Sequence, residues 1–214
     1  MTSPLVTAAA VLFDLDGVLV DSLQVVERSW RRWAADQHLD ADAVLAQIHG
    51  RRAAELVRMF APDLDPVQEV ARLTGYETED GGGGLTAIPG APACVDVARQ
   101  GRWAVVTSGG RDLATLRLKA VGLPVPEVLV TGDDVERGKP DPQPYLRAAE
   151  VLGVPPARCV VVEDAPAGIQ AGKQAGMTVL AVATTHQPDA LTQADRVFRG
   201  MDEVTSYLSD SPLV

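Results

Sequence analysis

The length, composition and charge of the chain limit what it can be. It has 214 residues, 46% of them hydrophobic, and a formal net charge of −10 at pH 7. A chain of this size buries enough apolar surface to fold without disulfides or structural metals. The negative charge argues against nucleic acid or an anionic membrane as a partner, because both are bound through basic patches. A small anionic ligand remains compatible if a metal ion or placed Lys and Arg side chains reverse the local field.

The cysteines and the hydropathy pattern predict a cytoplasmic protein. Cys94 and Cys159 lie in apolar runs and match no metal-ligand spacing, which predicts buried, reduced thiols. The N-terminal stretch lacks the charged and apolar regions of a signal peptide. No apolar run approaches the ~20 residues that span a bilayer.

The first predicted element is a buried strand, AAAVLFD, that ends on Asp14. Four amphipathic segments with helical periodicity follow, at 22–37, 40–48, 51–60 and 66–73. In the first of them Ser22 suits the N-cap position, and Trp30 and Trp33 are spaced as core residues of a helical layer rather than as a sugar platform. The glycines at 81–84 then predict a hinge.

The second half alternates apolar strands with helices. The strands are predicted at 104–109, 128–133, 159–164 and 178–184, and the helices at 111–121, 144–153 and 166–176. Near-continuous apolar strands that alternate with helices predict a parallel sheet covered on both faces. We therefore predict an α/β fold: a Rossmann-like core formed by 1–20 and 85–214, with an α-helical cap domain inserted at 21–84.

Polar side chains gather where these strands end, and ligands bind beyond the carboxyl ends of strands in open parallel sheets. The residues at those ends and in the GKPDP loop are Asp14, Asp16, Thr107, Ser108, Lys139, Glu163 and Asp164. Single residues of this kind are weak signals, since a lone lysine is more often a surface salt bridge and an acidic pair an N-cap. Together, in this order, they predict one site.

Four motifs carry a resemblance to a known family. FDLDGVLVDS, VVTSG, RGKPDPQPYL and VVVEDAPAGIQAGKQAG resemble, in order, the motifs of the haloacid dehalogenase superfamily, in its phosphatase branch with a helical cap. HGRRAAELVRMFAPDLD with VVTSGGRD is most similar to bacterial broad-specificity sugar phosphatases and to yeast-type glycerol-phosphate and deoxyglucose-phosphate phosphatases. The resemblance implies Mg²⁺-dependent hydrolysis of a small phosphorylated metabolite through an aspartyl-phosphate.

The resemblance and the chemistry of the side chains assign the same roles. Asp14 would attack phosphorus, and Asp16 would act as general acid and then general base. Thr107, the Ser108 N–H and Lys139 would hold the phosphoryl oxygens. Gly17 would let the backbone turn beneath the phosphate. The magnesium ligands would come from Asp14, the Asp16 carbonyl, Glu163 and Asp164.

The resemblance also places IHGRR at the loop that closes over the leaving group, which makes His49, Arg51 and Arg52 candidates for substrate specificity. The alternative is that the two arginines begin the next helix as exposed charge. Arg111 and Asp112 are expected at an exposed helix start. His38 and His186 receive no role.

Other readings of the sequence remain. A sugar-phosphate mutase of the β-phosphoglucomutase type would share Asp14 and Asp16 but carry a histidine where this chain has Val26. A non-catalytic phosphate-binding protein would be expected to lack a motif aspartate, and a halide-releasing dehalogenase has no use for the acid Asp16. The sequence leaves open which sugar or polyol phosphate is hydrolysed, and the oligomeric state.

Overall fold

The structure is a computed structural model that describes residues 8–48, 51–79 and 83–210. Within these residues, six strands pair in parallel to form one sheet, in the order β5-β4-β1-β6-β7-β8. Their bounds are β1 Ala10–Phe13, β4 Arg102–Val106, β5 Val128–Val130, β6 Cys159–Glu163, β7 Thr178–Val182 and β8 Arg196–Phe198. The predicted α/β fold with a parallel sheet is confirmed.

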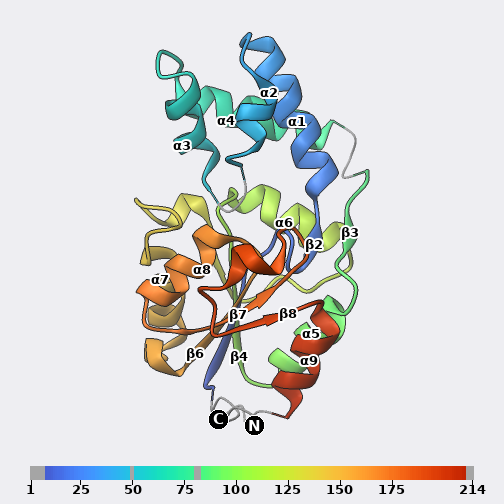
Figure 1. Ribbon diagram of the computed structural model, residues 1–214, viewed down its shortest axis with the longest axis vertical. Coiled ribbons are helices and arrows are strands. Elements are labelled where there is room, and N and C mark those ends of the chain that lie inside the picture. The colour runs from blue at the N-terminus through green and yellow to red at the C-terminus, as the bar shows by residue number, and fades with distance from the viewer. Residues whose placement is uncertain (1–7, 49–50, 80–82, 211–214) are drawn as a thin grey trace.

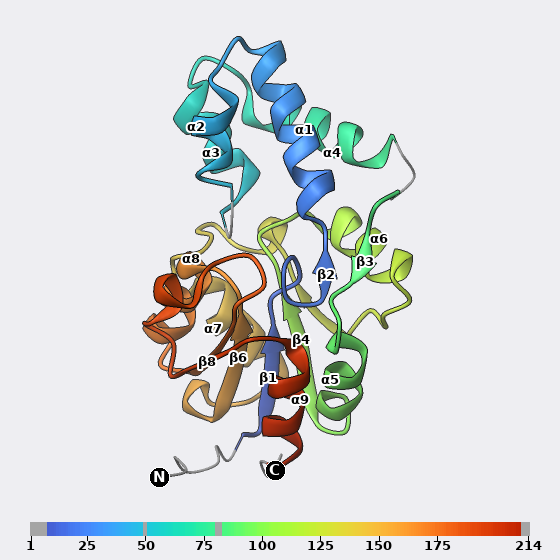
Figure 2. The same ribbon diagram turned by 45° about the vertical axis from the view of Figure 1, so that its right-hand side comes forward.

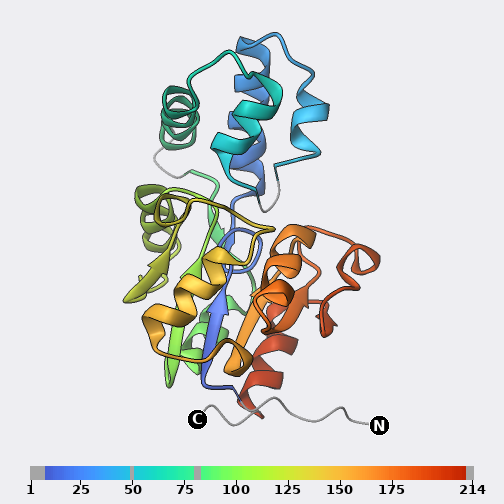
Figure 3. The same cartoon turned by 90° about the vertical axis from the view of Figure 1, so that its left-hand side faces the viewer.

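Helices cover both faces of this sheet because its strands carry apolar side chains on both sides. In β1, Val11 and Phe13 join one buried cluster, whereas Ala10 and Leu12 join the other. The first cluster includes side chains of α5 (Ala91–Ala98), α6 (Arg111–Ala120) and α9 (Met201–Ser209). The second includes side chains of α7 (Gln143–Leu152) and α8 (Pro166–Gln174). Figure 3 shows α7 and α8, in yellow-orange and orange, on one side of the sheet.

Within the described residues, the four remaining α-helices lie above the carboxyl ends of the strands (Figure 1). They are α1 Leu23–Asp36, α2 Ala41–Leu45, α3 Ala53–Phe60 and α4 Pro66–Thr78. These helices share a buried cluster of their own, in which Trp30 and Trp33 pack edge to face. The Trp33 indole N–H donates to the Glu69 carboxylate at 2.8 Å. The expectation that both tryptophans are core residues of this helical layer is confirmed.

A two-stranded ribbon joins the helical layer to the sheet. β2 (Val20–Asp21) and β3 (Thr86–Ala87) pair antiparallel, so the chain leaves for the helices and returns from them side by side (Figure 2). Of the glycines predicted as a hinge, 81 and 82 lie outside the described residues, and Gly84 has a positive φ of 97°. We retain 21–84 as the proposed cap.

The structure differs from the sequence prediction in several short elements. The strand expected at 128–133 ends at Val130, because the Thr131 side chain and the Asp134 carboxylate form a capping box around a 3₁₀ helix, Gly132–Asp134. Two more 3₁₀ helices occur at Pro156–Arg158 and Pro188–Leu191. Both cysteines are free and buried, as predicted. Among the described helices, none is long and apolar enough to cross a membrane.

Candidate active site

A cavity of about 300 Å³ lies between the carboxyl ends of the central strands and the helical layer. The sheet side of its lining contains Asp14, Asp16, Gly17, Thr107, Ser108 and Asp164, and the opposite side contains Val26, Trp30, Arg51, Arg52, Leu73 and Glu77. Of the residues predicted from the strand ends and the GKPDP loop, Asp14, Asp16, Thr107, Ser108 and Asp164 line this cavity. Lys139 and Glu163 lie behind Asp14 and are connected to it by hydrogen bonds. The cavity is shared by both parts of the fold.

Asp14 sits at the end of β1 and is 6% exposed. Its N–H donates to the Val162 carbonyl at 3.0 Å, which continues the sheet register, and its Oδ1 accepts from Lys139 Nζ at 2.6 Å. Burial raises the pKa of Asp14 to about 7, against the opposing effect of Lys139 and with a further contribution from Glu163. A carboxyl at this position is therefore poorly stabilised as an anion by the protein alone.

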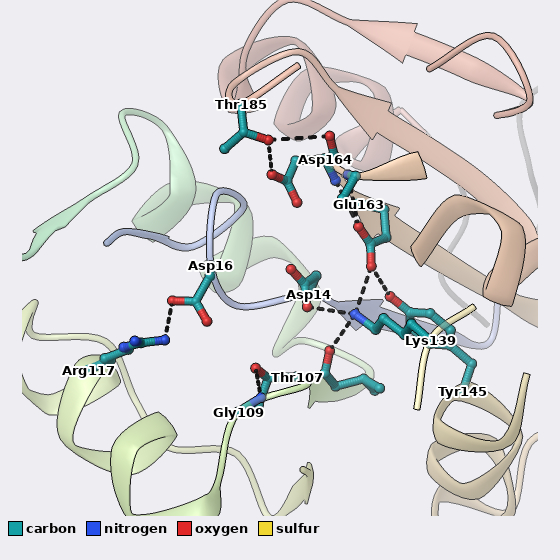
Figure 4. A network of polar contacts seen from close by, with 12 residues as sticks. Asp14, Asp16, Thr107, Gly109, Arg117, Lys139, Tyr145, Glu163, Asp164 and Thr185 are labelled. Atoms are coloured by element: carbon teal, nitrogen blue, oxygen red, sulfur yellow. Dashed lines mark hydrogen bonds and ion pairs between the residues drawn. The ribbon is translucent and has the colours of Figure 1, made fainter. Parts of the chain in front are cut away.

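Lys139 is almost completely buried and has a full set of partners (Figure 4). Its Nζ donates to Asp14, to Glu163 Oε1 at 2.7 Å and to the Val106 carbonyl at 3.0 Å. Burial alone would lower the pKa of Lys139, but the two adjacent carboxylates more than offset it and raise the pKa above its usual value. Lys139 is a fixed cation of the site, and the alternative of a surface salt bridge is excluded.

The Glu163 carboxylate is enclosed by hydrogen-bond donors. Oε1 also accepts from the Tyr145 hydroxyl at 2.8 Å, and Oε2 accepts from the N–H groups of Asp164 at 3.0 Å and Ala165 at 3.1 Å. A Cβ at Gly168 would lie 1.6 Å from Oε1, so α8 approaches this carboxylate as closely as only glycine permits. Glu163 thus anchors Lys139 from the far side of the site.

Asp164 is the second fully buried acid at the end of β6. Burial, reinforced by the charges of Glu163 and Asp14, raises its pKa well above the usual range. The Thr185 hydroxyl donates to its Oδ2. Gly17 has a φ of 83° and lies against the same oxygen: a Cβ at Gly17 would stand 2.2 Å from Asp164 Oδ2. The tight turn predicted at Gly17 is present, and it brings the loop after β1 against Asp164.

Asp16 points away from the other acids, toward α6 (Figure 4). Its Oδ1 accepts from the Ser22 hydroxyl at 2.6 Å and forms an ion pair with Arg117 Nη1 at 2.7 Å. Ser22 does stand at the N-cap position of α1, but its side chain makes no capping hydrogen bond, because the hydroxyl is directed at Asp16 instead. The predicted N-cap position of Ser22 is confirmed, but its side chain binds Asp16 rather than capping the helix.

Thr107 and Ser108 follow β4 and line the cavity next to Asp14. Thr107 is 3% exposed, and its Oγ1 accepts the Gly109 N–H at 3.1 Å, which shapes the loop before α6. Helix α6 begins at Arg111, and both Arg111 and Asp112 are exposed, as predicted.

The predicted specificity residues are only partly described. His49 lies outside the described residues. Arg51 and Arg52 both line the cavity. The Arg52 guanidinium reaches from the helical layer to the sheet domain, where its Nη1 donates to the carbonyls of Val135 at 3.1 Å and Glu136 at 2.8 Å. A contact of either arginine with substrate stays a prediction.

Sequence reasoning missed Tyr145, Thr185 and Arg117, which contact predicted residues, and Glu77, which contacts Arg117. Arg117 shares the buried face of α6 with Ala114 and Leu118, and Glu77 shares the buried face of α4 with Leu73. A charged residue in the register of a buried helix face is the signal that could have identified both. Tyr145 and Thr185 carry no comparable signal, since a tyrosine in a helix and a threonine after a strand are ordinary.

Comparisons with known proteins agree with this geometry. The family model for the haloacid dehalogenase-like hydrolases matches residues 8–176. The chain is 44% identical to "Hexitol phosphatase A" of Escherichia coli over 91% of this chain and 92% of that protein. It is 36% identical to "Glycerol-1-phosphate phosphohydrolase 1" of Saccharomyces cerevisiae, over 86% and 78% of the two chains. The crystal structure of a hydrolase from Pseudomonas syringae matches with a TM-score of 0.83 and 27% identity, over 94% and 98% of the two chains. The chain belongs to the haloacid dehalogenase-like hydrolase family.

Proposed function

We propose that this enzyme hydrolyses phosphate monoesters of small sugars or polyols, with Asp14 as the nucleophile. The observation that carries the proposal is the placement of Asp14: a buried carboxylate at the end of β1, held at 2.6 Å by the fixed cation Lys139, with Asp16 two residues further along the cavity wall. A nucleophile of this kind divides one difficult hydrolysis into two easier displacements.

The acid cluster fits a divalent cation. Asp14, Glu163 and Asp164 offer ligand atoms that lie within 4.8 Å of one another. Burial and mutual repulsion raise the pKa of Asp14 and of Asp164. The protein therefore supplies too little positive charge to keep all three carboxylates ionised. All-oxygen donors suit Mg²⁺, which Asp14, Asp164 and the Asp16 carbonyl would hold. The sequence also predicts Glu163 as a ligand, but both of its oxygens already accept hydrogen bonds, so we assign it to anchoring Lys139 beside the ion. When bound, the ion supplies positive charge that offsets the carboxylates and polarises the phosphoryl group.

The residues around Asp14 are arranged for phosphoryl transfer. The Asp14 carboxylate forms a bond to phosphorus while the bond from phosphorus to the alcohol oxygen breaks, and the products are an aspartyl-phosphate and the alcohol. The Thr107 hydroxyl and the Ser108 N–H would hold the phosphoryl oxygens as charge develops on them. Lys139 would join them by redirecting the N–H that it donates to Asp14, once Asp14 is bonded to phosphorus.

Asp16 completes both steps by moving one proton. In the first step its carboxyl group donates a proton to the departing alkoxide. In the second, the resulting carboxylate accepts a proton from water, whose oxygen attacks phosphorus and releases phosphate from Asp14. Because the Asp16 side chain is about a third exposed (31%), it has access to both the alcohol and the water.

The substrate class follows from the opposite wall of the cavity together with the named relatives. Arg51 and Arg52 supply donors, whereas Val26 and Leu73 supply apolar surface, a mixture that suits a short polyhydroxylated chain. The mutase alternative is not favoured, because the aliphatic side chain of Val26 lines the cavity where that mechanism needs a histidine.

The test is phosphate release from a panel of polyol and sugar phosphates, with Mg²⁺, by the wild type and by Asp14→Asn. The amide is nearly isosteric but is unable to attack phosphorus, so turnover should fall by at least about three orders of magnitude while the protein stays folded. Melting temperature and a circular dichroism spectrum provide the control for folding. Turnover by Asp14→Asn within tenfold of the wild type would rule out this nucleophile.

A further inference from the structure

A chain of three charged side chains runs from the helical layer to the acid–base residue. Glu77 comes from α4, Arg117 from α6 and Asp16 from the loop after β1. Arg117 Nη1 pairs with Asp16 Oδ1 at 2.7 Å, and Arg117 Nη2 pairs with the Glu77 carboxylate. Figure 4 shows Arg117 on the side of Asp16 that faces away from Asp14.

Stability alone is a poor explanation for this arrangement. Arg117 is 4% exposed and Glu77 is 8% exposed, so both charges have lost most of their hydration. The attraction within a buried ion pair often fails to offset that loss, and an apolar pair of similar volume is commonly as stable. Arg117 Nε, moreover, is buried without a partner among the described residues. The pairing therefore points to a role in orienting a side chain.

The contacts of Asp16 show which of its two carboxylate oxygens is held and which is left to face the substrate. Ser22 and Arg117 both bind Oδ1, so among the described contacts Oδ2 is left for the substrate. A planar guanidinium fixes the direction of a carboxylate far better than a flexible ammonium does. Since proton transfer requires the acid within hydrogen-bond reach of the leaving oxygen, a small rotation of Asp16 is costly.

We propose that Arg117 is a positioning residue for Asp16, and that Glu77 makes this positioning depend on how the helical layer sits over the site. Glu77 belongs to the helical layer, and Arg117, with which it forms an ion pair, belongs to the sheet domain. When the layer moves away, Arg117 loses one of its two carboxylates and water reaches the pair, so the hold on Asp16 loosens. The inference rests on the proposed phosphatase function.

The experiment compares variants of this chain on two classes of substrate. The variants are Arg117→Met, Arg117→Lys and Glu77→Gln, with Glu79→Gln as the matched control. Glu79 stands two residues beyond Glu77 and pairs with Arg32 at 2.5 Å, but both of these side chains are more than half exposed. The substrates are glycerol 1-phosphate and a hexitol phosphate, whose leaving groups need a proton, and p-nitrophenyl phosphate, whose leaving group does not.

We expect kcat/KM on the alkyl phosphates to fall about 10- to 100-fold for Arg117→Met and less for Arg117→Lys and Glu77→Gln. On p-nitrophenyl phosphate the loss should stay below about threefold, because kcat/KM covers only the steps through departure of the leaving group. Glu79→Gln should match the wild type on every substrate. A purely structural role would lower activity on both substrate classes equally, and that result would overturn the proposal.

A double-mutant cycle gives the second readout. If Arg117 acts through Asp16, then Arg117→Met should cause no further loss in an Asp16→Asn background, whereas independent effects multiply. Multiplied losses, or equal activities of Glu77→Gln and Glu79→Gln, would refute the proposal.

Should Arg117→Met fail to fold, the nearly isosteric Glu77→Gln and the charge-conserving Arg117→Lys decide the outcome. A wild type without Asp14-dependent hydrolysis refutes the proposed function itself, whereas an active wild type with insensitive variants refutes this inference alone.

Discussion

Lys139 is a single positive charge surrounded by more carboxyl groups than it can neutralise. Its ammonium group contacts Asp14 and Glu163, and Asp164 belongs to the same acid cluster. Three carboxyl groups therefore face one cation in a region that water hardly reaches, and burial is the main reason that the pKa of Asp14 rises to about 7. Without a divalent ion, Asp14 is therefore protonated below about pH 7, and under the proposed function it has to lose this proton before it attacks phosphorus.

This proton predicts how stability depends on pH. The folded pKa of Asp14, about 7, lies above its ordinary value of 3.8, so its contribution to stability is fully present below about pH 4 and is lost as pH rises through about 7. The loss has a slope of at most about 1.4 kcal/mol per pH unit for one proton. Since Mg²⁺ requires the carboxylate, stabilisation by added Mg²⁺ should grow over the same range.

Urea unfolding across this pH range, with EDTA or with Mg²⁺, measures both effects. Asp14→Asn is the control, because its amide does not titrate and its pH dependence in EDTA should be shallower. Stabilisation by Mg²⁺ that stays constant with pH in the wild type would contradict the assignment of a raised pKa to this carboxyl group.

Some residues of the site were predictable from the sequence and others were not, for a physical reason. Asp14, Thr107 and Glu163 end apolar strands, and parallel strands bring such ends together whatever the rest of the chain does. Arg117 shares the buried face of α6 with Ala114 and Leu118, but an arginine is ordinarily exposed, so the sequence gives only a weak signal for its burial. Its burial depends on Glu77, 40 residues away in the chain, and local periodicity carries no information about that contact.

Helix α8 is positioned by a glycine rather than by a side chain. A Cβ at Gly168 would stand 1.6 Å from Glu163 Oε1, so Gly168→Ala should displace the carboxylate that anchors Lys139. We expect a destabilisation of about 1–3 kcal/mol, as for other overpacked cores, together with reduced activity. Urea unfolding and phosphate release measure the two effects.

Gly75 of α4 provides the opposite case for comparison. A Cβ there would meet nothing within 4 Å, so Gly75→Ala should stabilise the protein by about 0.5–1 kcal/mol through helix propensity alone. If the two alanine variants changed the free energy of unfolding in the same direction, the close packing of α8 on Glu163 would not be the reason for glycine at 168.

At the level of elements, the sequence predicted the apolar strands and most helices but not α5, α9 or the short strand β8. The apolar runs that became β1, β6 and β7 are buried at nearly every position, which makes them recognisable. β8 has three residues, Arg196–Phe198, none of them fully buried, and its strand conformation depends on pairing with β7. Pairing at a sheet edge is a tertiary effect that no local pattern encodes.

Across the whole molecule, Arg52 is the clearest contact between the helical layer and the sheet domain. It binds the carbonyls of Val135 and Glu136, in the loop that leads to Lys139. Arg52→Ala should therefore loosen closure over the substrate and lower kcat/KM on polyol phosphates by about one to two powers of ten. The loss on p-nitrophenyl phosphate should be small, because its leaving group needs few contacts.

The ratio of kcat/KM on the two substrates is the measurement, and Arg58→Ala is the control. Arg58 lies on the same helix, is exposed, and its hydrogen bond is to the Ala54 carbonyl of that helix. Unchanged kcat/KM on both substrates in Arg52→Ala would mean that Arg52 is structural only. An equal loss on both substrates, which leaves the ratio unchanged, would place its effect on the Lys139 loop instead.

The pairing of β2 with β3 has a consequence for how such enzymes diversify. Val20 lies opposite Ala87, so the two ends of the helical insert lie side by side where they join the sheet domain. A segment whose ends are held together adds little closure entropy to its host, and that cost grows only slowly with its length. A different inserted segment can thus replace the helical one without altering the register of the strands in the sheet domain. Under the proposed function, the phosphate chemistry of the sheet domain and the substrate choice of the helical insert would then vary independently in evolution. The condition is that a new insert also brings a carboxylate to Arg117.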